Sequence, residues 1–173
     1  MAENNIILVD EFDNEIGVEE KIEAHKKGLL HRAFSIFIFN SKGELLLQQR
    51  AKSKYHSGRL WTNTVCSHPM PNENLIDATK RRLQEEMGFF TETKEIFSFM
   101  YKSEYENGLT EHEFDYVFFG FYNDNPIPNK DEVEDYKWVT IKDLENDVEQ
   151  NPNNYTTWFK KILKNEKFIL EIK

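Results

Sequence analysis

The side chains most able to do chemistry are concentrated in the middle of the chain, over residues 61–89. This stretch contains the only cysteine, Cys66, with His68 two residues later, and it ends in the adjacent glutamates Glu85 and Glu86. A thiol, an imidazole and carboxylates can exchange protons, and each can also bind a divalent cation. The stretch therefore indicates acid–base or metal-assisted chemistry, and the rest of the chain must position it.

The second half of this stretch has the pattern of an amphipathic helix that begins after Asn72 or Asn74 and stops at Gly88. Asparagine is a favourable N-cap, and glycine commonly ends a helix. Five residues recur at helical spacing and predict a core-facing stripe: Leu75, Ile76, Thr79, Leu83 and Met87. Two arginine–glutamate pairs stand four residues apart and can meet on one face, as they also would on an ordinary solvated surface: Arg81–Glu85 and Arg82–Glu86.

A second group of acids lies in the strand predicted over residues 110–122. Glu111 and Glu113 share one face of that strand, with Asp115 beside them, because residues two apart point to the same side. His112 points to the opposite face. Neighbouring carboxylates repel each other unless water, a proton or a cation separates them. A solvent-facing strand edge and a cation site are both open interpretations of this pattern.

The elements that must hold these groups follow from hydrophobic periodicity and turn residues. Strands are expected over residues 5–10, 31–40, 44–50, 95–105, 110–122 and 136–139, with a further short strand after the turn at 13–17. Helices are expected over residues 19–27, 72–88 and 141–148, and over 155–163 with a continuation towards Phe168. This alternation predicts an α+β fold with a mixed β-sheet between helices, in one domain over residues 1–173.

Composition limits the class of partner. The net charge of −9 argues against a general nucleic-acid binder or a protein that binds anionic membranes. A single cysteine cannot form an intrachain disulfide, the N-terminal residues are acidic rather than signal-like, and no apolar run approaches a membrane span. We therefore expect a cytoplasmic location. A monomer and a homodimer both remain open.

From Ser67 onward the segment resembles a Nudix box. Its pattern is Gly, five residues, Glu, seven residues, Arg-Glu, an apolar residue, any residue, Glu-Glu, any residue, Gly and an apolar residue. Seven residues match in register: Glu73, Arg81, Leu83, Glu85, Glu86, Gly88 and Phe89. Ser67 replaces the first glycine, and Arg82 replaces the glutamate that helps Nudix hydrolases build the magnesium site for diphosphate cleavage. The resemblance implies a Nudix fold, an α/β/α sandwich.

A more specific resemblance rests on Thr62-Asn63 followed by Cys66-Ser67-His68-Pro69. These residues are similar to the type I isopentenyl-diphosphate isomerase branch of the Nudix superfamily, and an arginine at Arg82 fits that branch. The resemblance covers roughly residues 9–158. It implies conversion of isopentenyl diphosphate to dimethylallyl diphosphate. Two alternatives are a Nudix hydrolase of a nucleoside or prenyl diphosphate, and a catalytically silent diphosphate-binding module.

The resemblance also implies two metal sites and an anion clamp. A lone histidine is more often a surface or core residue than a ligand, but the family holds one Mn²⁺, Mg²⁺ or Zn²⁺ ion through residues that map onto His25, His31, His68, Glu111 and Glu113. A further Mg²⁺ joins the diphosphate to Glu86. The cations expected to bind the diphosphate are Lys21, Arg50, Lys54, Arg81 and Arg82.

The isomerisation needs a strong acid and a base on either side of a buried carbon skeleton, because an unactivated alkene is a poor base and water would destroy the cation. The resemblance assigns the acid to Glu113, with Tyr101 hydrogen-bonded nearby, and the base to Cys66 as a thiolate. Trp158 matches the aromatic residue that stabilises the cation through its π face. An ordinary core position in a C-terminal helix is an equally open interpretation of Trp158.

Overall fold

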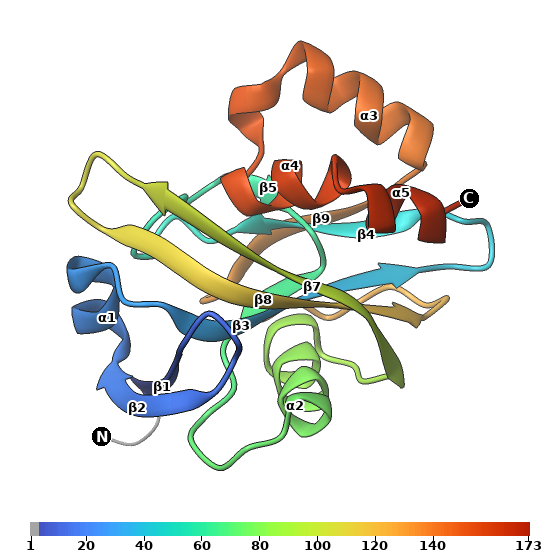
Figure 1. Ribbon diagram of the computed structural model, residues 1–173. Helices are drawn as coiled ribbons and strands as arrows, with labels where there is room; N and C mark the ends of the chain where they lie inside the picture. Colours follow the sequence, from blue (N-terminus) through green and yellow to red (C-terminus); the bar gives the residue numbers. More distant parts are fainter. Residues whose placement is uncertain (1–3) are drawn as a thin grey trace.

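The structure is a computed structural model that describes residues 4–173, so the first three residues of the domain expected over 1–173 lie outside it (Figure 1). Its strands are β1 (Asn5–Val9), β2 (Glu15–Glu20), β3 (His31–Phe39), β4 (Leu45–Arg50), β5 (Trp61–Thr62), β6 (Val65–Ser67), β7 (Thr93–Glu104), β8 (Thr110–Phe121) and β9 (Val133–Val139). Its helices are α1 (Lys21–Lys27), α2 (Leu75–Met87), α3 (Ile141–Gln150), η2 (Pro152–Asn154), α4 (Thr157–Leu163) and α5 (Glu166–Glu171).

Strand β3 is the centre of a mixed, nine-stranded sheet within the described residues. Strand β8 runs parallel to β3, and this register places His31 opposite Glu113. Strand β6 pairs with β3 in the antiparallel sense and places Cys66 opposite Ser35. Two segments that are far apart in the sequence therefore bring their reactive side chains to one strand.

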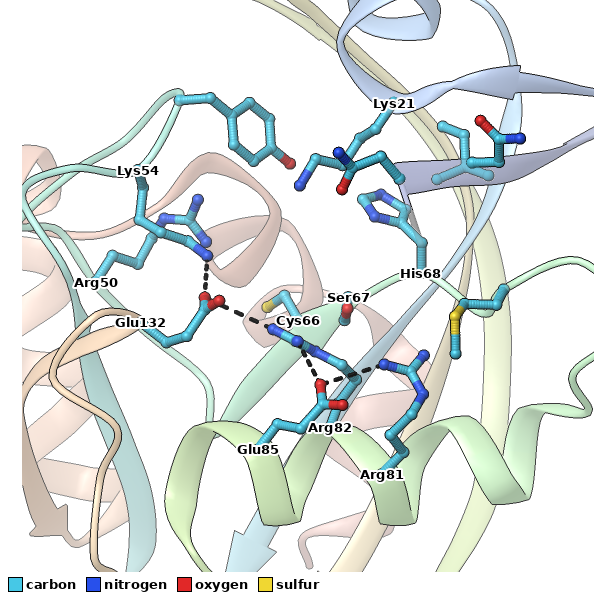
Figure 2. A pocket seen from close by; sticks show the side chains of 15 residues that line it. Lys21, Arg50, Lys54, Cys66, Ser67, His68, Arg81, Arg82, Glu85 and Glu132 are labelled. Carbon is cyan, nitrogen blue, oxygen red and sulfur yellow. Dashed lines mark hydrogen bonds and ion pairs between the residues drawn. The ribbon is translucent and has the colours of Figure 1, made fainter. Parts of the chain in front are cut away.

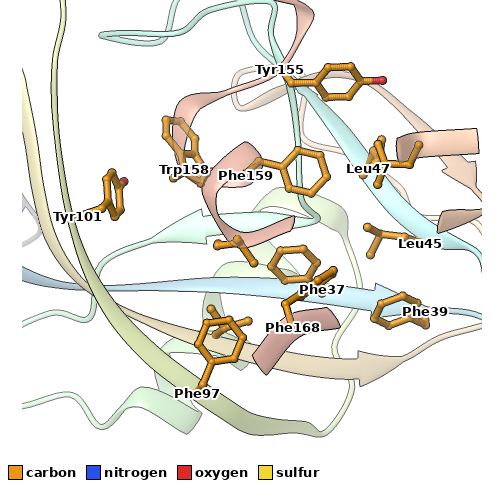
Figure 3. Close-up of a cluster of buried hydrophobic side chains, with 13 residues drawn as sticks. Phe37, Phe39, Leu45, Leu47, Phe97, Tyr101, Tyr155, Trp158, Phe159 and Phe168 are labelled. Carbon is orange, nitrogen blue, oxygen red and sulfur yellow. The ribbon is translucent and has the colours of Figure 1, made fainter. Parts of the chain in front are cut away.

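Helices cover both faces of the sheet (Figure 1). On one face, α2 packs against the even-numbered residues of β3, Phe34, Ile36 and Ile38. On the other face, α3, α4 and α5 pack against odd-numbered residues of the same strand, including Phe37 and Phe39 (Figure 3). Because strand side chains alternate between faces, the apolar run of this one strand can supply both cores. The predicted α+β sandwich, with a mixed sheet between helices, is confirmed.

Helix α2 has the predicted ends. The Asn74 side chain accepts a hydrogen bond from the Asp77 N–H, and Gly88 ends the helix in the left-handed conformation with φ of 74°. The predicted stripe is wrong at Ile76, which is 38% exposed. The buried face instead includes Ala78, because the first turn presents that position to the sheet and directs Ile76 to solvent.

The C-terminal segment differs from the single helix expected there. It forms α4 and α5, separated at Lys164 and Asn165, and the Asn165 side chain caps α5 by accepting a hydrogen bond from the Lys167 N–H. The break lets the chain turn so that Phe168 packs against Phe37, with ring centroids 5.0 Å apart. The short strands β5 and β6 were not expected from the sequence. None of the helices in the described chain is long and apolar enough to cross a membrane.

The left-handed cap of α2 yields a stability prediction. Alanine in the left-handed region costs roughly 1–2 kcal/mol, and at Gly88 its Cβ would also clash with the carbonyl oxygen of Ile127. Gly43 has a similar φ of 75°, but a Cβ at that position would meet open space. We expect Gly88→Ala to lower the free energy of unfolding in urea clearly more than the matched Gly43→Ala. Equal losses would contradict the packing at the cap.

Candidate active site

Five side chains predicted as metal ligands meet in one buried cluster. Their ligand atoms all lie within 4.8 Å of one another, and they come from α1, the start of β3, the residue after β6, and β8: His25, His31, His68, Glu111 and Glu113. Glu111 is 2% exposed and Glu113 is 7% exposed. The alternative of a solvent-facing strand edge is therefore wrong, because β8 is covered on this side.

The backbone orients two of the imidazoles towards the cluster. The Nδ1 atom of His25 is 2.6 Å from the carbonyl oxygen of Lys21, one turn earlier in α1. The Nδ1 atom of His31 is 2.8 Å from the carbonyl oxygen of Leu29. A carbonyl only accepts, so each Nδ1 carries a hydrogen, and in the neutral imidazole Nε2 then presents a lone pair. Such hydrogen bonds on the remote nitrogen are typical of histidines that bind metals.

The atoms that face each other inside the cluster lack hydrogen-bond partners. His25 Nε2, His31 Nε2 and Glu111 Oε2 are buried and unpaired among the described residues. His25 Nε2 lies 3.3 Å from Glu111 Oε2, and His31 Nε2 lies 3.5 Å from Glu113 Oε1. Buried polar atoms are rarely left unpaired in proteins. A divalent cation would satisfy all of these atoms at once, so the cluster fits a divalent metal site.

Burial sets the protonation of the cluster in the metal-free chain. It lowers the pKa of His68 to about 3, which keeps this imidazole neutral. Burial and the charge of Glu113 raise the pKa of Glu111 to about 7. Burial also acts to raise the pKa of Glu113, but its polar contacts with Glu111, His31 and His68 outweigh it and hold this pKa well below its usual range. Neutral imidazoles and an ionised carboxylate are the forms that ligate metals.

A small inner cavity of about 20 Å³ lies beside the cluster. Its lining includes all four residues predicted to act on the carbon skeleton: Cys66, Tyr101, Glu113 and Trp158. The Tyr101 hydroxyl donates a hydrogen bond of 2.9 Å to Glu113 Oε2, as the sequence resemblance led us to expect. A cavity of this size holds about one water molecule, so it can admit a hydrocarbon chain only if its walls move.

Cys66 is held as a thiol. Burial raises its pKa to about 12. The thiol donates to Asn63 Oδ1 at 3.0 Å, and the indole N–H of Trp158 donates to its sulfur at 2.8 Å. The proton in the metal-free chain therefore resides on Cys66 rather than on Glu113, whereas the sequence resemblance assigns the proton to Glu113 during alkene protonation.

Trp158 is a core residue that also lines the inner cavity, and its role towards a carbocation stays a prediction. It is 3% exposed and belongs to the apolar cluster with Phe37 and Phe159. Figure 3 shows Trp158 and Tyr101 at one side of that cluster, away from Leu45 and Phe39. The same indole lines the inner cavity. It is a core residue with one side available to a ligand.

A larger outer cavity of about 360 Å³ adjoins Cys66 and His68 (Figure 2). Its lining includes all five cations predicted to bind a diphosphate: Lys21, Arg50, Lys54, Arg81 and Arg82. Burial and the charge of Lys54 lower the pKa of Lys21. Two acids also line the cavity. Glu132 pairs with Lys54, and Glu85 lies 2.6 Å from Arg82. The chain thus concentrates positive charge here despite its acidic total.

Glu86, the predicted magnesium residue, does not line this cavity, whereas its neighbour Glu85 does. The Glu86 carboxylate is buried and accepts hydrogen bonds from Arg82 Nη2 at 2.6 Å and from Gln48 Nε2 at 3.1 Å. A cation at Glu86 must therefore replace or share its contact with Arg82. The magnesium site at Glu86 stays a prediction.

Sequence reasoning missed two residues of the site. Glu132 pairs with Lys54 at the outer cavity. His56 lies in the loop between β4 and β5, and its imidazole is hydrogen-bonded to Glu111. No local pattern identifies either one, because their partners are remote in the chain.

Comparison with known proteins agrees with this geometry. The NUDIX domain family matches residues 29–159. Isopentenyl-diphosphate Delta-isomerase 2 of Aromatoleum aromaticum is 53% identical over 156 residues, which cover 90% of this chain and 82% of that protein. Isopentenyl-diphosphate Delta-isomerase of Serratia proteamaculans is 48% identical over 159 residues, which cover 92% and 89%. Among solved structures, DR0079 from Deinococcus radiodurans has a TM-score of 0.71 at 20% identity and covers 85% of this chain and 90% of that one.

The solved structure supports the NUDIX fold alone, because its sequence is so different. The NUDIX match and the two close relatives go further. The chain belongs to the isopentenyl-diphosphate Delta-isomerase family within the NUDIX class. The family resemblance predicted from the sequence is confirmed.

The high pKa of Cys66 can be tested by alkylation. Only the thiolate reacts with iodoacetamide, and an ordinary cysteine ionises with a pKa of about 8.5. In the metal-free chain we expect the alkylation rate to keep rising beyond about pH 9, because burial raises the pKa of the thiol to about 12. The urea-unfolded chain serves as the control and should level off in the ordinary range. A plateau in that same ordinary range for the folded chain would contradict the buried thiol.

The metal cluster yields a binding prediction. We expect the double variant His31→Gln/His68→Gln to lose its bound divalent metal, measured by elemental analysis after dialysis, because two of five ligand groups are replaced. His112→Gln is the matched control, since His112 lies on β8 but bonds the Gly28 carbonyl oxygen outside the cluster. Full metal content in the double variant would show that the cluster is not the binding site.

Proposed function

We propose that this chain is an enzyme that isomerises isopentenyl diphosphate to dimethylallyl diphosphate. The observation that carries the proposal is that Cys66 and Glu113 line one inner cavity, beside a buried cation site and next to a cavity lined by cations. The family relationship supports the same reaction, because the close relatives are isopentenyl-diphosphate Delta-isomerases.

The diphosphate and the prenyl chain of the substrate occupy different cavities. The diphosphate binds in the outer cavity, where arginine forks and lysine ammonium groups match phosphate oxygens. Glu86 of the α2 helix would hold a Mg²⁺ ion that accompanies the diphosphate, once its contact with Arg82 is replaced or shared. Cys66 and His68 line the outer cavity and also the inner one, so they mark where the prenyl chain leaves the cations and approaches the acid and base.

Cys66 and Glu113 exchange protons with the carbon chain. The Glu113 carboxyl gives its proton to the terminal methylene of the alkene, which leaves a tertiary cation at the neighbouring carbon. The Cys66 thiolate then removes a proton from the adjacent methylene, and the double bond forms one position along the chain. Every phosphorus–oxygen bond remains intact, and one proton has been added and one removed.

These roles require the proton to move from sulfur to the Glu113 carboxyl when the site fills. One contact of the structure and one expected effect of substrate binding support such a shift. The indole N–H of Trp158 donates to the Cys66 sulfur and stabilises its thiolate form. A hydrocarbon packed against Glu113 removes water from that carboxylate and raises its pKa.

Other residues protect and orient the reacting groups. Tyr101 holds one oxygen of Glu113 by a hydrogen bond. The indole of Trp158 offers a π face to the cation, and its burial in the apolar cluster excludes water. The five-residue cluster would hold a Mn²⁺, Mg²⁺ or Zn²⁺ ion, which would supply positive charge to offset the two buried glutamates.

Arg82 disfavours the alternative of diphosphate hydrolysis. Its guanidinium lies 2.6 Å from Glu85 and 2.6 Å from Glu86, and these carboxylates raise its pKa further. A fixed cation between these acids opposes the additional metal needed to activate water. We also propose that residues 1–173 act as one domain in the cytoplasm, as a monomer or a homodimer.

Isotope uptake distinguishes the isomerase from a hydrolase. In heavy water with isopentenyl diphosphate and Mg²⁺, we expect deuterium to enter the prenyl chain while phosphate release stays at background. The label should be measured by mass spectrometry and the phosphate by a colorimetric assay. Phosphate release without deuterium uptake would establish the hydrolase instead.

Cys66→Ala is the matched variant for this assay. The change is small, so the fold should persist, and it removes the proposed base. We expect deuterium uptake to fall by about 10²-fold or more, since positioned acid–base groups contribute that much. An unchanged rate would exclude Cys66 from the mechanism.

A further inference from the structure

His56 makes a contact with the metal cluster without belonging to it. Its imidazole is 5% exposed, and Nε2 is hydrogen-bonded to Glu111 Oε1. The ligand atoms of the cluster lie within 4.8 Å of one another, and His56 is not one of those five residues. Its Nε2 atom is already engaged with a carboxylate oxygen.

Because of this hydrogen bond, the two oxygens of Glu111 have different neighbours. Oε1 is bound to His56, whereas Oε2 faces His25 Nε2 at 3.3 Å and is unpaired among the described residues. Glu111 is ionised when it binds a metal, so its oxygens then only accept hydrogen bonds. The His56 Nε2 atom must then carry the hydrogen, while Nδ1 accepts from the Ser57 hydroxyl at 3.0 Å.

The imidazole of His56 is itself tightly packed. It stacks on the ring of Tyr105 with centroids 4.6 Å apart and an angle of 11°. The rings of Tyr55 and Trp158 meet it edge-on, at 4.4 and 5.6 Å. Three aromatic neighbours thus leave the imidazole little freedom to turn away from Glu111.

The backbone of His56 is tied to the outer cavity. Arg50, one of the cations that line this cavity, donates a hydrogen bond of 3.2 Å to the His56 carbonyl oxygen. The Arg50 guanidinium also lies 5.1 Å from the centre of the Trp158 ring. His56 therefore connects the cationic cavity and the aromatic wall with one oxygen of the metal cluster.

We infer that His56 is a positioning residue, which holds Glu111 so that this carboxylate offers a single oxygen, Oε2, to the metal ion. This inference rests on the metal site proposed above. Hydrogen bonds from outside a metal site fix the orientation of its ligands, and their loss typically weakens metal affinity about 10–100-fold.

Two variants separate the hydrogen bond from the packing. His56→Phe keeps an aromatic ring beside Tyr105 and removes the N–H donor. His56→Gln loses the ring but retains an amide N–H at the level of Nε2. Binding of Mn²⁺ to the metal-free variants is measured by electron paramagnetic resonance of the free ion, and cooperative thermal unfolding verifies the fold. His112→Gln controls for the loss of a histidine from the same region of the sheet.

We expect His56→Phe to weaken Mn²⁺ binding by about 10–100-fold and His56→Gln to recover part of that loss. Wild-type affinity in His56→Phe, or an equal loss in both variants, would overturn the inference. If His56→Phe does not fold, His56→Asn replaces it, because its amide reaches only the level of Nδ1, beside Ser57. A wild-type chain that binds no Mn²⁺ would instead overturn the proposed metal site itself.

Discussion

Two acidic side chains that are buried side by side on one strand carry the main electrostatic cost in this fold. Glu111 and Glu113 lie on the same face of β8 and are almost inaccessible to water. Burial and mutual repulsion both oppose ionisation of such a pair. The surrounding histidines offset this cost only in part, since several of their facing atoms remain without hydrogen bonds among the described residues. A cation at this cluster would stabilise the arrangement, so we expect metal binding and the local structure to be coupled.

The sheet brings the ligands together through pairings between distant segments. The parallel register of β3 and β8 sets His31 opposite Glu113, and the pairing of β6 with β3 delivers Cys66 to the same area. The helix α1 contributes His25 through a backbone hydrogen bond that fixes its ring. These groups are held by regular elements rather than by free loops, which favours the accurate geometry that proton transfer requires.

The distribution of charge separates binding from chemistry. A chain with a net charge of −9 gathers five cations around its outer cavity, so an anionic diphosphate is attracted to one place on an otherwise acidic protein. The inner cavity is small, aromatic and acidic, and it can stabilise positive charge on carbon. Arg82 belongs to both the cavity lining and the α2 helix, where it occupies the position that a hydrolase gives to a metal-binding carboxylate. In the proposed function, this one side chain favours diphosphate binding and disfavours hydrolysis.

Local pattern in the chain was enough to predict the features that depend on near neighbours. The caps at Asn74 and Gly88, the strand β3 and the spacing of Glu111 and Glu113 depend on short-range properties, and the family motif from Thr62 to Phe89 identified the reaction class. Which side of β8 is buried became clear only in the folded chain, because periodicity shows that two acids share a face but not what covers that face. For the same reason only the fold revealed His56 beside Glu111 and Glu132 beside Lys54. The expected C-terminal helix is divided in two in the structure, and Phe168 packs against Phe37. Each of these outcomes depends on contacts between residues far apart in the chain, which no local window of sequence contains.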